Sequence, residues 1–168
     1  MQKKGYENTI IYDDDTYSGT KNYLASSRFS LYTSQNFNLR FGGAVSNLTS
    51  NMETGNKLGG AGELQFNGKF KNLFYSSSNY LSSGYFSGMR KGVVNLNERI
   101  NLPAGKYNLW GVYNYLSAKP EAFGNQFTST HFSTARYDIG ASRRFSSLVI
   151  SLSPYYYTES RKEQLTST

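Results

Sequence analysis

Cysteine is absent from this chain of 168 residues, which also has only three prolines, one tryptophan and one histidine. Without cysteine there can be no disulfide bond and no thiolate metal ligand. No apolar run approaches the roughly 18 residues that a transmembrane helix needs. The first ten residues contain two lysines but no apolar segment behind them, so they do not have the pattern of a signal peptide.

Hydrophobic residues are also scarce, at 38% of the chain, compared with roughly 45–50% in soluble domains. Aromatic residues nevertheless make up 16%, with 15 Tyr and 11 Phe. Low hydropathy together with abundant Tyr, Phe, Gly, Ser and Asn is typical of strands and turns and unfavourable for helices. The aromatic content also excludes an intrinsically disordered chain.

The net charge is +7, from 18 basic and 11 acidic residues. A basic balance can indicate nucleic acid or anionic lipid as a partner. Here the basic residues are scattered, and no basic run is longer than the pairs KK, RK and RR. This distribution favours solvated or pore-lining charges, and we expect no nucleic-acid partner.

Alternation with a period of two residues is the strongest pattern in the sequence. In residues 22–34, for example, Tyr23, Ala25 and Phe29 fall on one face of a strand and Arg28 on the other. Similar alternation recurs in residues 37–46, 58–70, 73–88, 93–102, 107–116, 127–144 and 148–157. The pattern predicts eight strands, and residues 6–12 are a candidate for a ninth. Glu98 falls in an apolar register and departs from the pattern.

Short and long connections alternate strictly between these segments. Short turns are expected at residues 34–36, 71–72, 103–106 and 145–146, and longer polar connections at 46–57, 87–92 and 117–126. An antiparallel up-and-down meander with all its short turns at one end has this layout. We therefore predict an all-β, up-and-down barrel of about eight strands; nine or ten strands, or a part of a larger barrel, remain as alternatives.

Closure into a barrel would hide the edges of such a meander, and two kinds of barrel are compatible with alternation. A lipocalin-like barrel has its apolar residues inside, whereas a transmembrane barrel has them outside, facing lipid. Long charged side chains on the polar faces, tyrosines near strand ends and strands of roughly 10–16 residues favour the transmembrane barrel. The predicted lumen-facing charges are Arg28, Arg40, Glu63, Lys69, Arg99, Arg136, Asp138 and Arg144; the predicted aromatic girdle is Tyr80, Tyr85, Tyr107, Tyr113, Tyr115, Tyr155, Tyr156 and Tyr157.

In these features residues 22–158 resemble Gram-negative outer-membrane β-barrel proteins, and stretches such as SLSPYYYTES are similar to barrels of Bacteroidota. The resemblance implies a bacterial outer-membrane location and a role as a channel, or as a structural or transport component of an outer-membrane complex. The implied partners are the lipid bilayer and other outer-membrane proteins or the rest of a larger barrel.

Around the barrel of residues 22–158, residues 1–21 are expected to form an N-terminal extension or extra strand with an acidic loop. Residues 159–168 are expected to form a polar tail or the start of a loop. Complete barrels of this kind usually have both termini in the periplasm and an aromatic residue at the end of the last strand. Because the chain continues beyond Tyr157, we expect an excised or incomplete part of a larger barrel, or a barrel closed by another element.

Few residues point to catalysis or metal binding. His131 shares a strand face with Ser129 and Ser133, but hydroxyls two residues away along a strand lie roughly 7 Å off, too far for direct proton transfer. The acidic residues 13–19 do not match the EF-hand spacing. We therefore expect no enzyme activity, no metal and no cofactor. The alternative function is that of a soluble β-barrel that binds a hydrophobic or carbohydrate ligand through its aromatic residues.

Overall fold

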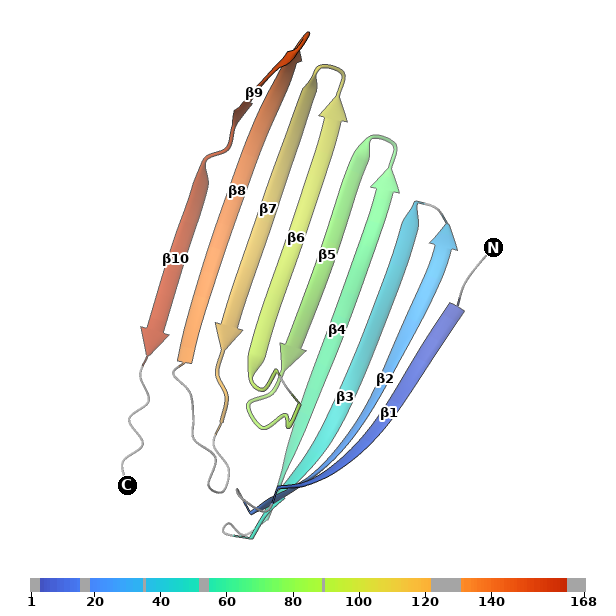
Figure 1. The fold of residues 1–168 in the computed structure, drawn as a ribbon, viewed down its shortest axis with the longest axis vertical. Coiled ribbons are helices and arrows are strands. Elements are labelled where there is room, and N and C mark those ends of the chain that lie inside the picture. The colour runs from blue at the N-terminus through green and yellow to red at the C-terminus, as the bar shows by residue number, and fades with distance from the viewer. Residues whose placement is uncertain are drawn as a thin grey trace.

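The computed structural model describes residues 4–15, 19–34, 36–51, 55–88, 90–121 and 131–162, and these form one antiparallel β-sheet (Figure 1). Its strands are β1 (Lys4–Asp15), β2 (Thr20–Ser34), β3 (Phe37–Ser50), β4 (Asn56–Phe70), β5 (Leu73–Ser82), β6 (Val93–Ala104), β7 (Tyr107–Ala118), β8 (His131–Phe145), β9 (Leu148–Leu152) and β10 (Tyr155–Lys162). The predicted all-β, up-and-down meander is confirmed. The extra segment near the N-terminus is a full strand of the sheet.

Each strand from β1 to β8 pairs with the next one along the chain, and β8 also pairs with both β9 and β10. Leu152 of β9 lies opposite Ala141, and Tyr155 of β10 lies opposite Asp138, so the two short strands continue in the same register along β8. Ser153 and Pro154 interrupt them, because proline has no N–H for the ladder. The ten strands therefore occupy nine positions across the sheet.

Three of the predicted tight turns are two-residue hairpin loops, at Lys71-Asn72, Gly105-Lys106 and Ser146-Ser147. The first residue of each has a positive φ, of 52°, 62° and 46° respectively, as the tight turns that suit twisted strands require. The β2–β3 hairpin reverses at the same end of the sheet (Figure 1).

The longer connections leave the opposite end of the sheet (Figure 1). One of them is shorter than expected, because β3 runs on to Ser50 and β4 starts at Asn56. The polar residues at these strand ends keep their ladder partners, as Thr49 opposite Asn56 shows. The loop predicted from polar composition at residues 46–57 was therefore too long, because both strands extend into it.

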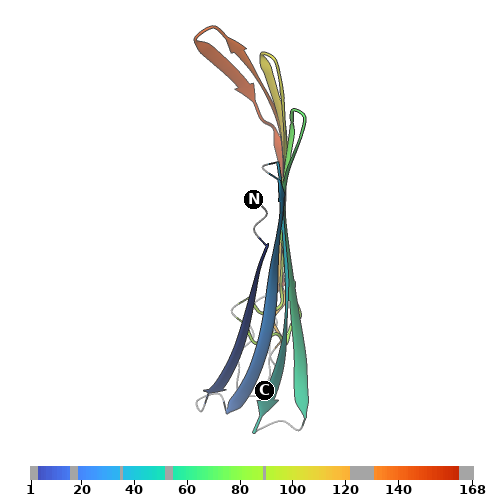
Figure 2. The same ribbon diagram turned by 90° about the vertical axis from the view of Figure 1, so that its right-hand side faces the viewer.

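The described strands do not close into the expected barrel. Within the described ranges, β1 pairs only with β2 and β10 only with β8, so the sheet has two open edges. Viewed along its edge, the sheet is a single twisted layer (Figure 2). Eight successive antiparallel pairings leave β1 and β10 running in the same direction, so a direct pairing between these two edges would be parallel.

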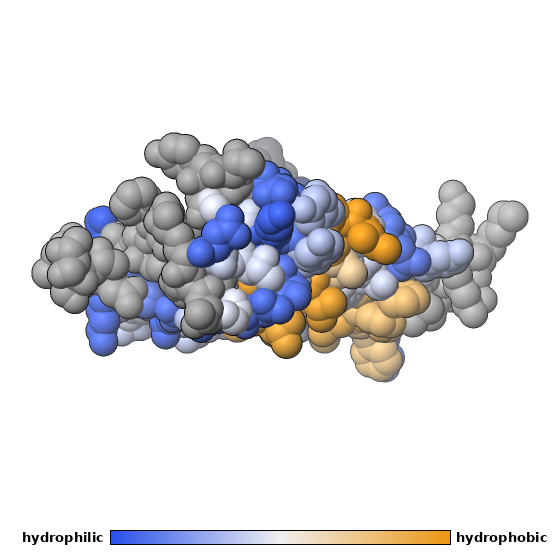
Figure 3. Space-filling model, turned by 90° about the horizontal axis from the view of Figure 1, so that it is seen from below, coloured by the Kyte–Doolittle hydropathy of each residue, from blue (hydrophilic) through white to orange (hydrophobic). Residues whose placement is uncertain are grey.

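A single layer has very little core. Among the described large hydrophobic side chains only Leu48 and Phe86 are buried, at 2% and 5% exposure, whereas Ile10 is 86% and Leu58 78% exposed. Seen from below, the hydrophobic side chains gather mostly along one side of the sheet (Figure 3). Within the described part of the chain, no helix is long and apolar enough to cross a membrane.

Candidate functional site

The pairing register assigns every strand residue to one of two faces. Residues directly opposite each other on neighbouring strands share a face, and one such row across β1–β5 runs Glu7, Arg28, Gly42, Glu63 and Tyr80. We call the face that carries this row the polar face and the opposite one the apolar face.

All eight charged residues that the sequence predicted to face a barrel lumen lie on the polar face. The register brings these eight side chains, which come from β2, β3, β4, β6 and β8, to the same side of the sheet: Arg28, Arg40, Glu63, Lys69, Arg99, Arg136, Asp138 and Arg144. Alternation within each strand was sufficient to group them, because the register shift between β2 and β3 falls at Tyr32–Ser34, at the end of β2 beyond Arg28. Their role as lumen residues stays a prediction.

Arg28 is the centre of an ion network on this face. Its Nε donates to Glu63 on β4, two strands away, and its Nη1 lies 3.5 Å from Glu7 Oε2 on β1. The strand between Arg28 and Glu63 contributes Gly42, whose missing side chain leaves room for the pair: a Cβ there would lie 3.1 Å from Glu63 Cγ. The Glu63 side chain is only 18% exposed. The network is thus specified by charges on three strands and one glycine.

A second ion pair lies within β8, where Arg136 donates from Nε and Nη2 to the two carboxylate oxygens of Asp138 at 2.8 and 2.9 Å. Arg40 donates instead to Ser30 Oγ at 3.2 Å. Paired charges therefore stabilise the polar face near its first strands and again at β8. The remaining basic side chains give this face an excess of positive charge.

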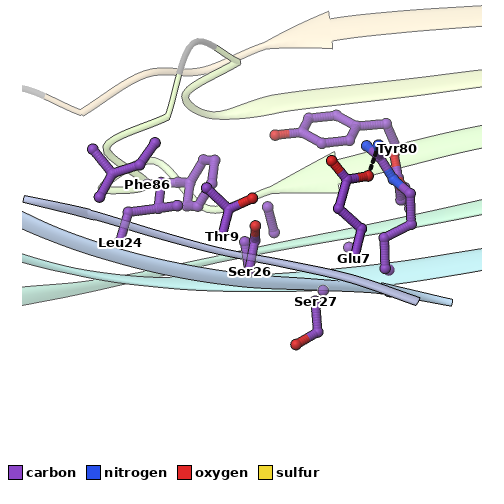
Figure 4. Close-up of a pocket in the computed structure, with 15 residues that line it drawn as sticks. Glu7, Thr9, Leu24, Ser26, Ser27, Tyr80 and Phe86 are labelled. Atoms are coloured by element: carbon purple, nitrogen blue, oxygen red, sulfur yellow. Dashed lines mark hydrogen bonds and ion pairs between the residues drawn. The ribbon is translucent and has the colours of Figure 1, made fainter.

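The Arg28 network borders a cavity of about 220 Å³ on the polar face. Figure 4 shows Glu7 and Thr9 of β1, Leu24 and Ser26 of β2, and Tyr80 of β5 pointing to the same side as Phe86, which belongs to the β5–β6 connection. Ser27 points to the other side of the sheet (Figure 4). One end of the cavity is charged and the other is lined by Leu24 and Phe86, so the cavity suits a molecule or segment with both polar and apolar groups.

The predicted girdle tyrosines are divided between the two faces. Tyr107, Tyr113, Tyr115 and Tyr156 lie on the apolar face, Tyr80, Tyr155 and Tyr157 on the polar face, and Tyr85 in the β5–β6 connection. Three consecutive tyrosines in one strand must alternate between faces. On the apolar face Tyr113 stacks on Tyr137 with ring centres 4.7 Å apart, and Tyr137 lies 6.3 Å from Tyr156. Tyr137 was not predicted as a girdle residue, but its ring contacts two tyrosines that were, Tyr113 and Tyr156.

Glu98, which departs from the alternating pattern, lies on the apolar face, where neighbouring side chains donate hydrogen bonds to its carboxylate. Ser77 Oγ and Asn79 Nδ2 donate to its Oε1 at 3.0 and 2.7 Å, and the Tyr75 hydroxyl donates to its Oε2. All three donors come from the neighbouring strand β5. The sequence places Tyr75, Ser77 and Asn79 on one face of β5. Only the β5–β6 register, however, shows that this face lies beside Glu98.

His131 is placed at the start of β8, where its Nε2 lies 3.4 Å from the Pro120 carbonyl oxygen. Ser133 shares its face, whereas Asp138 lies on the other one, and Ser129 is outside the described residues. Within the described ranges, no three His, Cys, Asp or Glu side chains come together as a metal site would require. The acidic residues 13–19 are only partly described, and there Asp14 forms an ion pair of 3.4 Å with Lys21.

The β5–β6 connection also carries a half-buried cation. Burial lowers the pKa of the Lys91 ammonium group below its ordinary value, and the nearby Glu121 carboxylate opposes this effect. Beside it, the Arg90 guanidinium lies 5.2 Å from the ring centre of Tyr80, in a cation–π contact. These contacts hold the connection close to the end of β5 and to the residues that follow β7.

Comparison of the chain with protein-family models, with curated proteins and with solved structures finds no match in any of the three. The site is therefore interpreted from its own geometry.

Proposed function

We propose that this chain forms part of the wall of a β-barrel in a bacterial outer membrane and acts as a channel, or as a structural or transport component of an outer-membrane complex. The single observation that carries the proposal is the separation of the two faces. Predicted lumen charges all lie on the polar face, while large hydrophobic side chains such as Tyr6, Ile10 and Ile139 extend from the apolar face with 75%, 86% and 71% exposure.

An apolar face of this extent is costly in water, because soluble monomers rarely expose contiguous apolar patches larger than a few hundred Å². In a bilayer the same face would be solvated by hydrocarbon, and the tyrosine hydroxyls would reach the headgroup region. The lipid bilayer is thus the partner that this face fits best.

The open edges add one requirement to the proposal. Every backbone group in hydrocarbon must be paired, so β1 and β10 must gain partners in the membrane. Because nine positions leave these strands parallel to each other, a barrel that is antiparallel throughout needs an odd number of further strands. We infer that such strands, from other outer-membrane proteins or from the rest of a larger barrel, complete the wall.

The test is a gel-mobility experiment on the chain refolded with and without detergent. The chain is expected to refold only with detergent, because its apolar face needs a hydrocarbon environment. Once it is assembled with the strands that complete the wall, it is expected to migrate faster when the sample is not boiled, because the closed barrel resists the denaturing detergent of the gel. Full solubility in plain buffer with a β-type circular dichroism spectrum would contradict the proposal. Binding of a hydrophobic or carbohydrate ligand by a soluble β-protein would then become the better explanation.

A further inference from the structure

The connection between β5 and β6 does not extend away from the sheet but folds back over the polar face. We call its residues 83–88 the strap. Ser87 Oγ donates to Asn22 Oδ1 of β2 at 2.5 Å, and the Ser87 backbone N–H donates to Ser46 Oγ of β3 at 3.2 Å. Starting from the end of β5, the strap thus reaches across β4 to β3 and β2.

Phe86 anchors the strap. It is 5% exposed, and the only other large hydrophobic side chain buried in the described part of the chain is Leu48, on the polar face beneath the strap. The Phe86 backbone lies directly over Gly59 of β4, where an added Cβ would be 2.5 Å from Phe86 Cα and 2.7 Å from Ser46 Oγ. Only a glycine at position 59 leaves room for the strap at this distance from the wall.

The base of the strap is fixed by backbone hydrogen bonds. The N–H groups of Phe86 and Gly92 donate to the Ser83 carbonyl at 3.1 and 2.9 Å, and the Glu121 N–H donates to the Gly84 carbonyl at 2.9 Å. The strap is therefore a defined turn with two attachments: one at its base, formed by these backbone hydrogen bonds, and a second one at its tip, formed by Phe86 and Ser87.

From these contacts we propose that the strap is a constriction that partly closes the path along the polar face, with Asn22, Ser46 and Gly59 as its docking site. The inference rests on the proposed function, because the polar face is the interior only if the wall is closed. In that arrangement the strap reduces the open cross-section next to the Arg28 network. Passing solutes would then meet the strap and the Glu7–Arg28–Glu63 charges together.

The tip is attached weakly enough to be released by single substitutions. Besides Phe86, two neutral hydrogen bonds hold it, and each makes only a modest net contribution to stability. Gly59→Val fills the notch under Phe86 while leaving a β-favouring residue in the strand. Gly62→Val is the matched control: Gly62 lies on the same strand but faces the apolar side, where an added Cβ meets nothing closer than 3.9 Å.

The experiment measures conductance in planar bilayers and trypsin cleavage after Arg90 and Lys91, using the complete barrel, assembled with the strands that close the wall, whose gel mobility changes on boiling. Gly59→Val is expected to conduct more than the unmodified chain and to be cleaved several-fold faster after Arg90 and Lys91, which follow the strap. Gly62→Val is expected to match the unmodified chain in both. Should Gly59→Val fail to refold, Asn22→Ala and Ser87→Ala each remove only the side-chain hydrogen bond between Ser87 and Asn22 and are expected to shift both readouts in the same direction.

A cross-link tests the state in which the tip of the strap cannot leave the wall. Because the chain has no cysteine, Asn22→Cys combined with Ser87→Cys offers a single disulfide that holds the tip on the wall. Oxidation is expected to keep conductance at or below the level of the unmodified chain, and reduction to raise it. Equal conductance in the unmodified chain and all variants would overturn the strap inference and leave the channel proposal standing. Absence of conductance in every variant, Gly59→Val included, would overturn the channel proposal and the inference together.

Discussion

Gly42 is the residue on which the charge network of the polar face depends. It lies between Arg28 and Glu63, and an added side chain would meet the Glu63 Cγ and Oε1 atoms and the Ser27 carbonyl oxygen, all at 3.1 Å. We expect Gly42→Val to lower the free energy of unfolding by about 1–3 kcal/mol, as overpacking does elsewhere. The measurement is urea-induced unfolding of the refolded protein.

The adjacent glycine is the control for this substitution. Gly43 faces the apolar side, and an added Cβ there would meet only the Ala61 carbonyl oxygen at 3.8 Å. Gly43→Val should leave stability unchanged or raise it slightly, because valine favours strands. Equal losses of unfolding free energy in both variants would mean that the loss of strand flexibility, and not the disturbed ion network, causes the destabilisation.

Glu98 shows how one polar residue is tolerated on the apolar face. Replacing it with leucine adds apolar surface but removes the acceptor of the Ser77 hydroxyl, on a residue only 7% exposed, and one of the two acceptors of Asn79 Nδ2. We expect Glu98→Leu to destabilise the protein by about 1–3 kcal/mol, the cost of unpaired buried donors. Combining it with Ser77→Ala and Asn79→Ala should recover most of that loss in the same unfolding measurement. A triple variant less stable than Glu98→Leu would contradict this explanation.

At the scale of single strands, the two faces of β7 and β8 predict opposite responses to the same charge. Ile139 lies on the apolar face with 71% exposure, and Asn114 lies on the polar face of the neighbouring strand. Within a bilayer, Ile139→Lys should cost about 2–4 kcal/mol near the midplane, and Asn114→Lys much less. Unfolding in lipid vesicles provides the comparison. If the apolar face were in water, both substitutions would stay within about 0.5 kcal/mol.

The strand pattern itself was predictable in most places. Alternation located nearly all the strands, and the positions of the short turns followed from residues such as Gly105. The ends of β3 and β4 and the split between β9 and β10 were not predicted. Hydrogen bonding continues through polar strand ends, and Pro154 separates β9 from β10 because it has no N–H to donate, although its carbonyl accepts from the Ile139 N–H at 3.2 Å. Alternation of side chains reports neither effect.

For the molecule as a whole, the edges of the sheet determine whether the wall is complete. The proposed membrane barrel requires the outward-pointing amides of β1 and β10 to be paired in lipid. We therefore expect these amides to exchange slowly with deuterium when the complete assembly is in vesicles, as slowly as the amides between β6 and β7. Fast exchange at either edge in lipid would contradict the proposed wall, whereas fast exchange of the isolated chain in buffer is expected from the open sheet.

The sequence by itself determined the two faces of this protein. A strand places successive side chains on opposite sides, so alternation groups Arg28, Glu63 and Asp138 without any knowledge of the fold. Only the tertiary structure decided that the described sheet stays open, that Glu98 meets its donors on β5, and that the strap lies on β2 and β3. These outcomes depend on strand register and on contacts between residues far apart in the chain, such as Asn22 and Ser87, which are 65 positions apart. A local pattern carries no information about either.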